Sequence, residues 1–315
     1  MHRNPNRREL VKTLGLTGIG VAALAASSTR GNSAPTSKPK FRFGLNTSTI
    51  RGQKLPFDEE IDLIAKAGYD GFEPWVSEIA NYRKSGGKLS DIRKRIQDHG
   101  LEVYGAIAFS QWIVDDAQQR AKGLEQAKRD MDLLSQIGGT HIAAPPSGAT
   151  NQSDLNLFAA ADRYRSLLEL GDEMGVIPEV EVWGFSKSLS RLGEALFVAV
   201  ESGHPKACLL PDVYHIYKGG SDFHGLKMIN GASIPALHMN DYPSDPPQEK
   251  IGDGDRIFPG DGIAPIKQVL NDLWLGGFRG VLSLELFNKR YWEQDPMKVA
   301  VEGLTKMKAE VSKAF

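Results

Sequence analysis

The chain contains a single cysteine, Cys208, among its 315 residues. One cysteine excludes an intrachain disulfide bond and a zinc site built from several thiolates. Cys208 lies within an apolar run, so we interpret it as a core residue rather than as a reactive thiol. The formal net charge of −1 gives no basic footprint, which argues against nucleic acid as a partner. No apolar run is long enough to cross a bilayer, so we expect no stable membrane insertion.

Residues 1–40 have the composition of an export signal followed by a linker. Arg7 and Arg8 precede a mildly apolar run, Thr13–Ala26, which is too short to span a membrane and contains small residues suited to signal cleavage. The paired arginines resemble a twin-arginine signal, which predicts export to the periplasm or another extracytoplasmic location. The alternative is an uncleaved N-terminal tail.

Residues 41–315 alternate between short apolar segments of strand type and longer segments with helical spacing. The expected strands begin at residues 41, 71, 102, 140, 177, 208, 234 and 280, and an expected helix follows each of them. Strict alternation predicts an α/β protein with a parallel sheet, and eight units of this length fit a single closed (β/α)8 barrel, the TIM barrel. A doubly wound open sheet would carry a glycine-rich phosphate turn after its first strand, which GLNTSTIRG does not match.

The last four expected strands each end close to a carboxylate or an imidazole. Their sequences are IPEVEVW, CLLPDVYHIY, IPALHMND and GVLSLELF, and the side chains concerned are Glu181, Asp212, His238 and Glu285. In a parallel barrel the C-terminal ends of all strands meet on one face, where catalytic groups lie. Three carboxylates and one imidazole form a hard, oxygen-rich set, which favours one Mn²⁺ or Mg²⁺ ion over Co²⁺, Fe²⁺ or Zn²⁺.

Several residues near these strand ends have alternative roles. Glu179 points to the same strand face as Glu181 and can replace it as a ligand, but we prefer Glu181 because it lies nearer the strand end. Asp212 can instead cap the helix that follows it. Asp241 either orients the ring of His238 or caps a turn.

The four strand ends, in this order, resemble the xylose-isomerase-like barrel superfamily and, within it, the sugar isomerase and epimerase branch. The motifs that carry the resemblance are E-V-W, L-P-D-V-Y-H, H-M-N-D and L-E-L, and it covers the chain from Phe41 to Ser312. The resemblance implies that the four side chains named above bind the metal and that His215 lies near the substrate. It also implies that Arg256 contacts a substrate hydroxyl, although the long Pro/Asp-rich loop before Arg256 makes this match looser.

The chemistry of such a site follows from its charges. A divalent metal bound to a hydroxyl and the adjacent carbonyl of an open-chain sugar acidifies the neighbouring C–H bond. Glu181 and Glu285 lie on different strands, so we predict that they are the catalytic residues, one removing a proton from that carbon and the other returning one from the opposite face. This predicts an isomerase or epimerase that acts on a carbohydrate or keto-sugar.

Two other functions use the same barrel. Loss of a β-leaving group would make the protein a dehydratase or another carbon–oxygen lyase acting on keto-sugars or keto-glycosides. A non-catalytic sugar-binding barrel is the third alternative, and it has no need for opposed carboxylates. The endonuclease branch of the superfamily requires further histidines on the second and third strands, and GFEPWV and GAIAFSQW contain none.

Two further residues are predicted to contact the substrate. Glu73 ends the second expected strand and can hydrogen-bond the substrate or an arginine. Trp112 follows the third, where an aromatic face can stack on a sugar, with core packing as the alternative. The expected outer helices can support a homo-oligomer, but no feature of the sequence specifies one.

Overall fold

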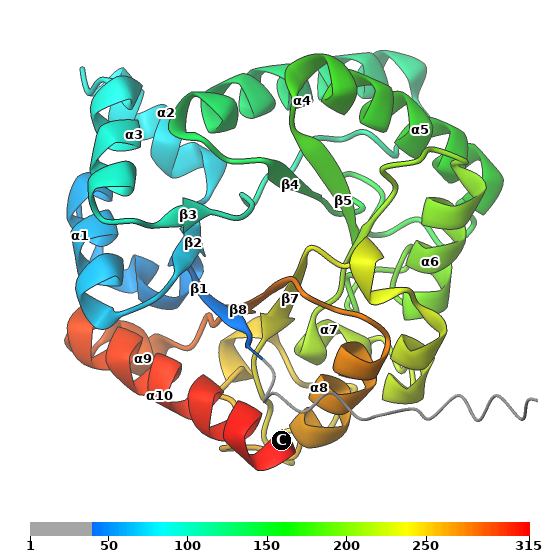
Figure 1. The fold of residues 1–315 in the computed structure, drawn as a ribbon. Coiled ribbons are helices and arrows are strands. Elements are labelled where there is room, and N and C mark those ends of the chain that lie inside the picture. Colours follow the sequence, from blue (N-terminus) through cyan, green and yellow to red (C-terminus); the bar gives the residue numbers. More distant parts are fainter. Residues whose placement is uncertain (1–39) are drawn as a thin grey trace, which may run out of the picture. The chain divides into compact units, whose positions relative to one another are not determined.

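The computed structural model describes residues 40–315 (Figure 1). The predicted export signal lies outside these residues, so the signal and the location it implies stay predictions. Among the described residues, no helix is both long enough and apolar enough to cross a membrane. Strands occupy the centre of the described part and helices surround them, as the alternation of the sequence predicts.

Every recorded pairing between the strands is parallel. The strands are β1 (Arg42–Asn46), β2 (Gly71–Glu73), β3 (Glu102–Val103), β4 (His141–Ala144), β5 (Ile177–Glu181), β6 (Leu209–Leu210), β7 (Ala236–Met239) and β8 (Val281–Leu284). Strand pairing joins them in the orders β3-β2-β1-β8-β7 and β4-β5-β6. The Ala106 N–H donates to the His141 carbonyl between β3 and β4, and the His238 N–H donates to the Pro211 carbonyl between β6 and β7. These bonds close the sheet, and the predicted (β/α)8 barrel is confirmed.

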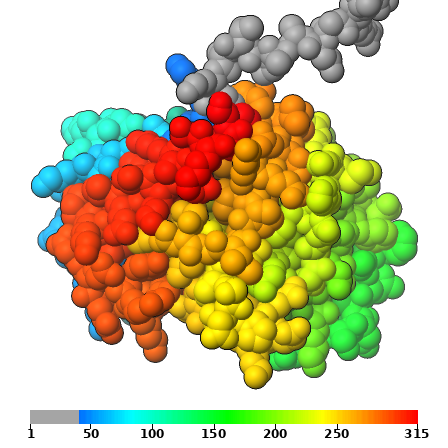
Figure 2. All heavy atoms as spheres, turned by 90° about the horizontal axis from the view of Figure 1, so that it is seen from below, coloured from blue at the N-terminus to red at the C-terminus, as the bar shows by residue number. Residues whose placement is uncertain are grey.

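The helices form a ring outside the strands (Figure 1). The α-helices are α1 (Phe57–Ala67), α2 (Val76–Lys84), α3 (Leu89–Asp98), α4 (Ala117–Ile137), α5 (Leu157–Met174), α6 (Leu192–Glu201), α7 (Val213–Lys218), α8 (Ile266–Leu275), α9 (Lys289–Trp292) and α10 (Pro296–Ala314). Short 3₁₀ turns are η1 (Thr47–Gln53), η2 (Phe223–Met228), η3 (Gly231–Ser233) and η4 (Asp253–Asp255). Helix α10, red in Figure 2, lies beside the orange segment that contains α8, and it also contacts α1.

Two segments differ from the sequence prediction. The second strand was expected to run to Val76, but it ends at Glu73 and Val76 begins α2. The Glu78 carboxylate accepts a hydrogen bond from the Trp75 N–H at 2.9 Å, which caps this helix start. The sixth strand has only two residues because the Asp212 carboxylate accepts from the His215 N–H at 2.9 Å and starts α7 directly after it.

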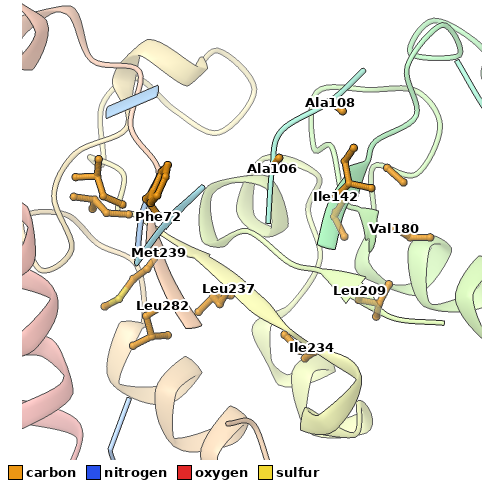
Figure 3. Close-up of a cluster of buried hydrophobic side chains, with 14 of the residues drawn as sticks. Phe72, Ala106, Ala108, Ile142, Val180, Leu209, Ile234, Leu237, Met239 and Leu282 are labelled. Carbon is orange, nitrogen blue, oxygen red and sulfur yellow. The ribbon is translucent and has the colours of Figure 1, made fainter. Parts of the chain in front are cut away.

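The main hydrophobic core lies between the strands and the surrounding helices. Figure 3 shows labelled side chains in this core from six strands: Phe72, Ile142, Val180, Leu209, Leu237 and Leu282. Because successive side chains of a strand point to opposite faces, Val180 in this core places Glu179 and Glu181 inside the barrel. A smaller apolar cluster that includes Tyr104, Ala236 and Val281 is separate from the main core.

A buried carboxyl group on α1 gives a prediction for stability. Burial and the nearby Glu78 carboxylate raise the pKa of Glu60 from 4.5 to about 9, against the opposing effect of Arg51. Between these values the unfolded chain releases the proton while the folded chain keeps it, so stability falls as pH rises. The loss amounts to about 3 kcal/mol at pH 7. Glu60→Gln should therefore be more stable than wild type at pH 7–8 and equal to it near pH 4, as measured by urea unfolding.

The neighbouring residue provides the control for this experiment. Glu59 is exposed on the same helix, so Glu59→Gln should change stability little at any pH. If the two variants show the same pH dependence, the Glu60 carboxyl group is not the cause.

Candidate metal centre and active-site cavity

Four side chains at the C-terminal ends of successive strands meet inside the barrel. Glu181 ends β5, Asp212 follows β6, His238 lies in β7 and Glu285 follows β8. All four are almost completely buried. One ligand atom each from Asp212, His238 and Glu285 lies within 4.8 Å of the others, which is a separation that one metal ion can bridge. Glu181 is not in this group of three but lines the same cavity as Glu285.

His238 is surrounded by carboxylates on both sides of its ring. Nδ1 lies 3.1 Å from Glu285 Oε2 and 3.6 Å from Asp212 Oδ2, and Nε2 lies 3.3 Å from Glu73 Oε2. Burial alone would lower the pKa of His238, but the charges of Glu285 and Glu73 raise it well above the ordinary value. The same acidic surroundings suit a bound cation.

Glu73 belongs to the surroundings of His238 and not to the cavity. Its carboxylate faces His238 and accepts a hydrogen bond from the Ser283 hydroxyl. Burial would raise the pKa of Glu73, but His238 and these hydrogen bonds lower it, so the side chain is ionised. Glu73 is not among the cavity-lining residues, and its position beside His238 suits a role in orienting that ring, while the predicted contact with substrate stays a prediction.

Arg256 forms ion pairs with several acidic groups at the C-terminal ends of the strands. Its Nη1 donates to Asp212 Oδ2 at 2.8 Å and to Glu285 Oε2 at 2.7 Å. Its Nη2 lies 3.0 Å from His215 Nε2 and donates to Asp253 Oδ1 at 2.5 Å. Burial alone would raise the pKa of Asp212, yet the Arg256 charge holds it well below the ordinary range. Arg256 is thus a fully buried cation that neutralises part of the carboxylate cluster.

Asp212 has two roles at once, because its two oxygens face different partners. Oδ1 caps α7 through the His215 N–H, as the alternative interpretation of this residue proposed. Oδ2 accepts from Arg256 and from the Asn240 side chain at 3.1 Å and points toward His238. A helix cap and a place in the acidic cluster are therefore compatible.

His215 lines the cavity and is neutral. Burial and the neighbouring Arg256 charge lower the pKa of His215 to about 4. The Gly184 N–H lies 3.3 Å from Nδ1, while Nε2 faces Arg256. A neutral imidazole has one N–H donor and one acceptor nitrogen, so His215 can form a hydrogen bond with an oxygen atom of a ligand in the cavity.

Glu181 and Glu179 lie on the same face of β5 but differ in access. Glu181 lines the cavity, whereas Glu179 does not. Burial, reinforced by the charges of Glu285 and Asp212, raises the pKa of Glu181 to about 8, against the opposing effect of His238. Burial raises the pKa of Glu179 well above its ordinary value, so it is a protonated group inside the barrel.

The unpaired atoms of the cluster fit a divalent ion. The Oε2 atom of Glu181 is buried and has no hydrogen-bond partner within residues 40–315, and neither ring nitrogen of His238 makes a well-aligned hydrogen bond, although both lie close to carboxylates. Buried polar atoms without partners are costly, and a cation held by Glu181 Oε2 and by Nδ1, the His238 nitrogen that faces Asp212 and Glu285, would satisfy these two atoms. Three carboxylates with one imidazole are the donor set that Mn²⁺ and Mg²⁺ prefer, and Zn²⁺ also accepts it.

The cavity above this cluster has a volume of about 200 Å³. It is lined by Trp75, Ile107, Phe109, Glu181, Trp183, Phe185, His215, Asp253, Arg256, Glu285 and Phe287. A larger hollow of about 690 Å³ opens beside Tyr104 and Val281, away from these carboxylates. We take the smaller cavity as the candidate active site because the buried acidic groups converge there.

Two residues near the predicted site have structural roles instead. Trp112 is completely buried, donates its Nε1 hydrogen to the Pro145 carbonyl at 2.8 Å and packs against Tyr164. It therefore belongs to the core, and the prediction of a substrate contact is not supported. The Asp241 carboxylate accepts from several backbone N–H groups of the following loop, including those of Gly260 and Gly262, so it caps a turn.

Sequence reasoning did not single out four cavity residues, namely Ile107, Phe185, Asp253 and Phe287. Phe185 and Phe287 each follow a site glutamate within a few residues, which was a usable signal. Asp253 lies three residues before Arg256 and pairs with it, but its loop offered no pattern from which this could be read.

Residues 61–310 match the family described as xylose isomerase-like TIM barrel. The 3-dehydroshikimate dehydratase of Pseudomonas aeruginosa is 26% identical over 247 residues, which cover 78% of this chain but only 38% of the dehydratase. The inosose isomerase of Bacillus velezensis is 25% identical over 265 residues, covering 82% of this chain and 92% of the isomerase. Epimerases are also among the relatives. A crystal structure of IOLI protein with a zinc atom has a TM-score of 0.80 at 22% identity and covers 87% of this chain and 99% of that chain.

Proposed function

Because the chain belongs to the xylose isomerase-like TIM barrel family, we propose that it is a metal-dependent isomerase or epimerase that moves a proton next to the carbonyl of a keto-sugar. The observation that carries this proposal is the pair of buried carboxyl groups, Glu181 and Glu285, in one small cavity. They come from β5 and β8, which are not neighbours in the barrel. A carbon atom held between them would have a carboxyl group on each side.

Glu181, Asp212, His238 and Glu285 would hold the divalent ion, with Mn²⁺ or Mg²⁺ favoured by the oxygen-rich set. When bound, the ion would polarise the carbonyl group and an adjacent hydroxyl of the sugar. The zinc atom in the structure of the fold neighbour supports a divalent ion in a barrel of this kind.

The side chains that line the cavity would transfer the protons and bind the substrate. Burial raises the pKa of Glu181 to about 8, and its Oε2 has no hydrogen-bond partner within the described part of the chain, so Glu181 is proposed to carry the proton that is returned to the substrate. Glu285 is paired with Arg256 and held through Oε1 by the Asn46 side chain at 3.1 Å, and this carboxylate is proposed to remove the substrate proton on the other face. Arg256 and His215 would bind the substrate oxygen atoms.

A dehydratase is the second candidate, supported by the similarity to 3-dehydroshikimate dehydratase. The chain spans about two fifths of that relative, 38% of its length, so its activity is a proposal here. In this reaction the same carboxyl group removes the proton next to the carbonyl. The C–O bond to a hydroxyl group on the following carbon then breaks, and a carbon–carbon double bond forms. The second carboxyl group gives its proton to the departing hydroxyl group, which leaves as water.

Proton exchange with solvent tests the proposal directly. Protein loaded with Mn²⁺ would be incubated in D₂O with inosose, 3-dehydroshikimate and a panel of ketohexoses, and followed by proton NMR. We expect a single metal ion per chain and deuterium next to the carbonyl of at least one compound, both lost in His238→Ala. Release of water with an alkene product would establish the dehydratase. Absence of metal uptake and of exchange would overturn the proposal in favour of a sugar-binding barrel.

A further inference from the structure

An arc of aromatic rings borders the candidate active-site cavity. The ring centroids of Trp75 and Phe109 are 5.0 Å apart, those of Phe109 and Trp183 are 6.0 Å apart, and those of Trp183 and Phe185 are 5.0 Å apart. Phe287 extends the arc at the other end, 6.2 Å from Trp75. All five residues line the cavity, so we call them the aromatic rim.

The exposure of the lining side chains to solvent rises from the floor of the cavity to its entrance. Its acidic floor, including Glu181 and Glu285, is buried, and Trp75, Trp183 and Phe287 of the rim are half-buried. Phe109 and Phe185 are the outermost, with 37% and 47% of their surfaces exposed. Most polar groups that can bind hydroxyls therefore lie at the bottom, and the entrance is aromatic apart from Asp253, whose side chain is 42% exposed and is paired with Arg256.

The size of the cavity limits what the floor can hold. Its volume of about 200 Å³ lies below the roughly 300–1,000 Å³ of pockets that enclose drug-sized ligands. A single hydroxylated ring fits this space, and any larger substituent on that ring must pass the entrance. At the entrance it would meet mainly the rings of Phe109 and Phe185, with Asp253 as the partly exposed polar side chain there.

The inner part of the rim is held in place before any ligand binds. The Arg51 guanidinium carbon lies 3.7 Å from the centroid of the Trp75 ring, a close cation–π contact. The backbone N–H of Trp75 donates to the Glu78 carboxylate, which also accepts from the Thr47 hydroxyl at 2.7 Å. A rigid aromatic wall loses little entropy when a flat group stacks on it, which favours binding.

We propose that the substrate is a keto-sugar glycoside with an apolar, planar substituent, which binds on Phe109 and Phe185 while the sugar ring occupies the acidic floor. This inference rests on the proposed function and names its substrate class. An aryl group at the entrance would cover two exposed phenylalanine faces, which releases water from apolar surface on both sides. A small polar substituent would gain nothing there.

Binding of unreactive glycosides tests this subsite without any turnover. Phenyl and methyl β-D-glycosides of the gluco and galacto series would be titrated into Mn²⁺-loaded protein, with tryptophan fluorescence and calorimetry as readouts. We expect the phenyl glycoside to bind about tenfold more tightly than its methyl partner in at least one series, from stacking and burial of the added ring. The preference should disappear in the double variant Phe109→Ala, Phe185→Ala.

The control is a more exposed aromatic residue away from the cavity. Phe158 is 63% exposed and packs edge-on against Phe197 on the outer helices, so Phe158→Ala should keep the phenyl preference. Equal binding of phenyl and methyl glycosides, no binding of either, or a preference that survives the double variant would overturn the inference. If the preference is found but the 3-keto derivatives of these glycosides show no proton exchange, the proposed function fails while the subsite stands.

Discussion

Replacing either Glu181 or Glu285 by glutamine is expected to lower the rate of proton exchange next to the substrate carbonyl by about 10²–10⁴-fold. A glutamine amide cannot replace the carboxyl group in proton transfer, and the third carboxyl group that lines the cavity, Asp253, has a side chain that is 42% exposed instead of buried in the cavity floor. The measurement is the rate of deuterium incorporation by NMR with protein saturated with Mn²⁺.

The two variants should differ in their affinity for the metal. Glu285 lies in the compact group with Asp212 and His238, so Glu285→Gln should weaken Mn²⁺ binding as well as catalysis. Glu181 is outside that group, so Glu181→Gln should retain more of the affinity while losing exchange. Calorimetric titration with Mn²⁺ separates these effects.

Glu179→Gln is the matched control for Glu181→Gln. Glu179 lies on the same face of the same strand but does not line the cavity, and burial keeps it protonated, so an amide is a close replacement. We expect exchange to stay close to the wild-type rate. Loss of exchange in Glu179→Gln together with its retention in Glu181→Gln would show that the two glutamates have been assigned the wrong way round.

Arg256→Met is expected to destabilise the metal-free protein by about 3–5 kcal/mol. Arg256 is fully buried and neutralises Asp212 and Glu285 through Nη1, so its removal takes away the closest counter-charge of two buried carboxylates and leaves them with the His238 ring as cationic neighbour. Thermal unfolding in the presence of a chelator measures this loss.

The same substitution should increase the affinity for a divalent ion. In the variant, Asp212 Oδ2 and Glu285 Oε2 are no longer shared with a guanidinium, and the positive charge that repels the incoming ion is gone. Mn²⁺ should therefore raise the melting temperature of Arg256→Met by more than that of wild type.

A surface arginine provides the comparison for this variant. Arg165 pairs with Glu169 one helical turn away, and both side chains are about half exposed, at 52% and 57%. Exposed pairs of this kind contribute at most about 1 kcal/mol, so Arg165→Met should change neither stability nor Mn²⁺ response appreciably. An Arg256→Met protein that melts like Arg165→Met would contradict the role of Arg256 as internal counter-ion.

The clearest difference between the sequence interpretation and the structure concerns Trp112. It was assigned to the substrate because it lies near a strand end, yet it packs on Tyr164, and Glu73, assigned on the same ground, faces His238. A position near the C-terminal end of a strand determines only that the residue lies on the face of the barrel where the strands end. Whether its side chain enters the cavity, the core or the neighbourhood of another polar group depends on residues far away in the chain.

The sequence by itself determined the (β/α)8 fold and the strand ends that carry Glu181, Asp212, His238 and Glu285. Both follow from local patterns, because alternating strands and helices form a parallel sheet, eight such units without a glycine-rich phosphate turn fit a closed barrel, and a barrel gathers its strand ends on one face. Only the tertiary structure decided which groups meet there, such as Arg256 with Asp212 and Glu285, and which aromatic rings border the entrance. These contacts join segments from different units of the barrel, and the path of each connecting loop is set by packing and charge pairing that no local pattern records.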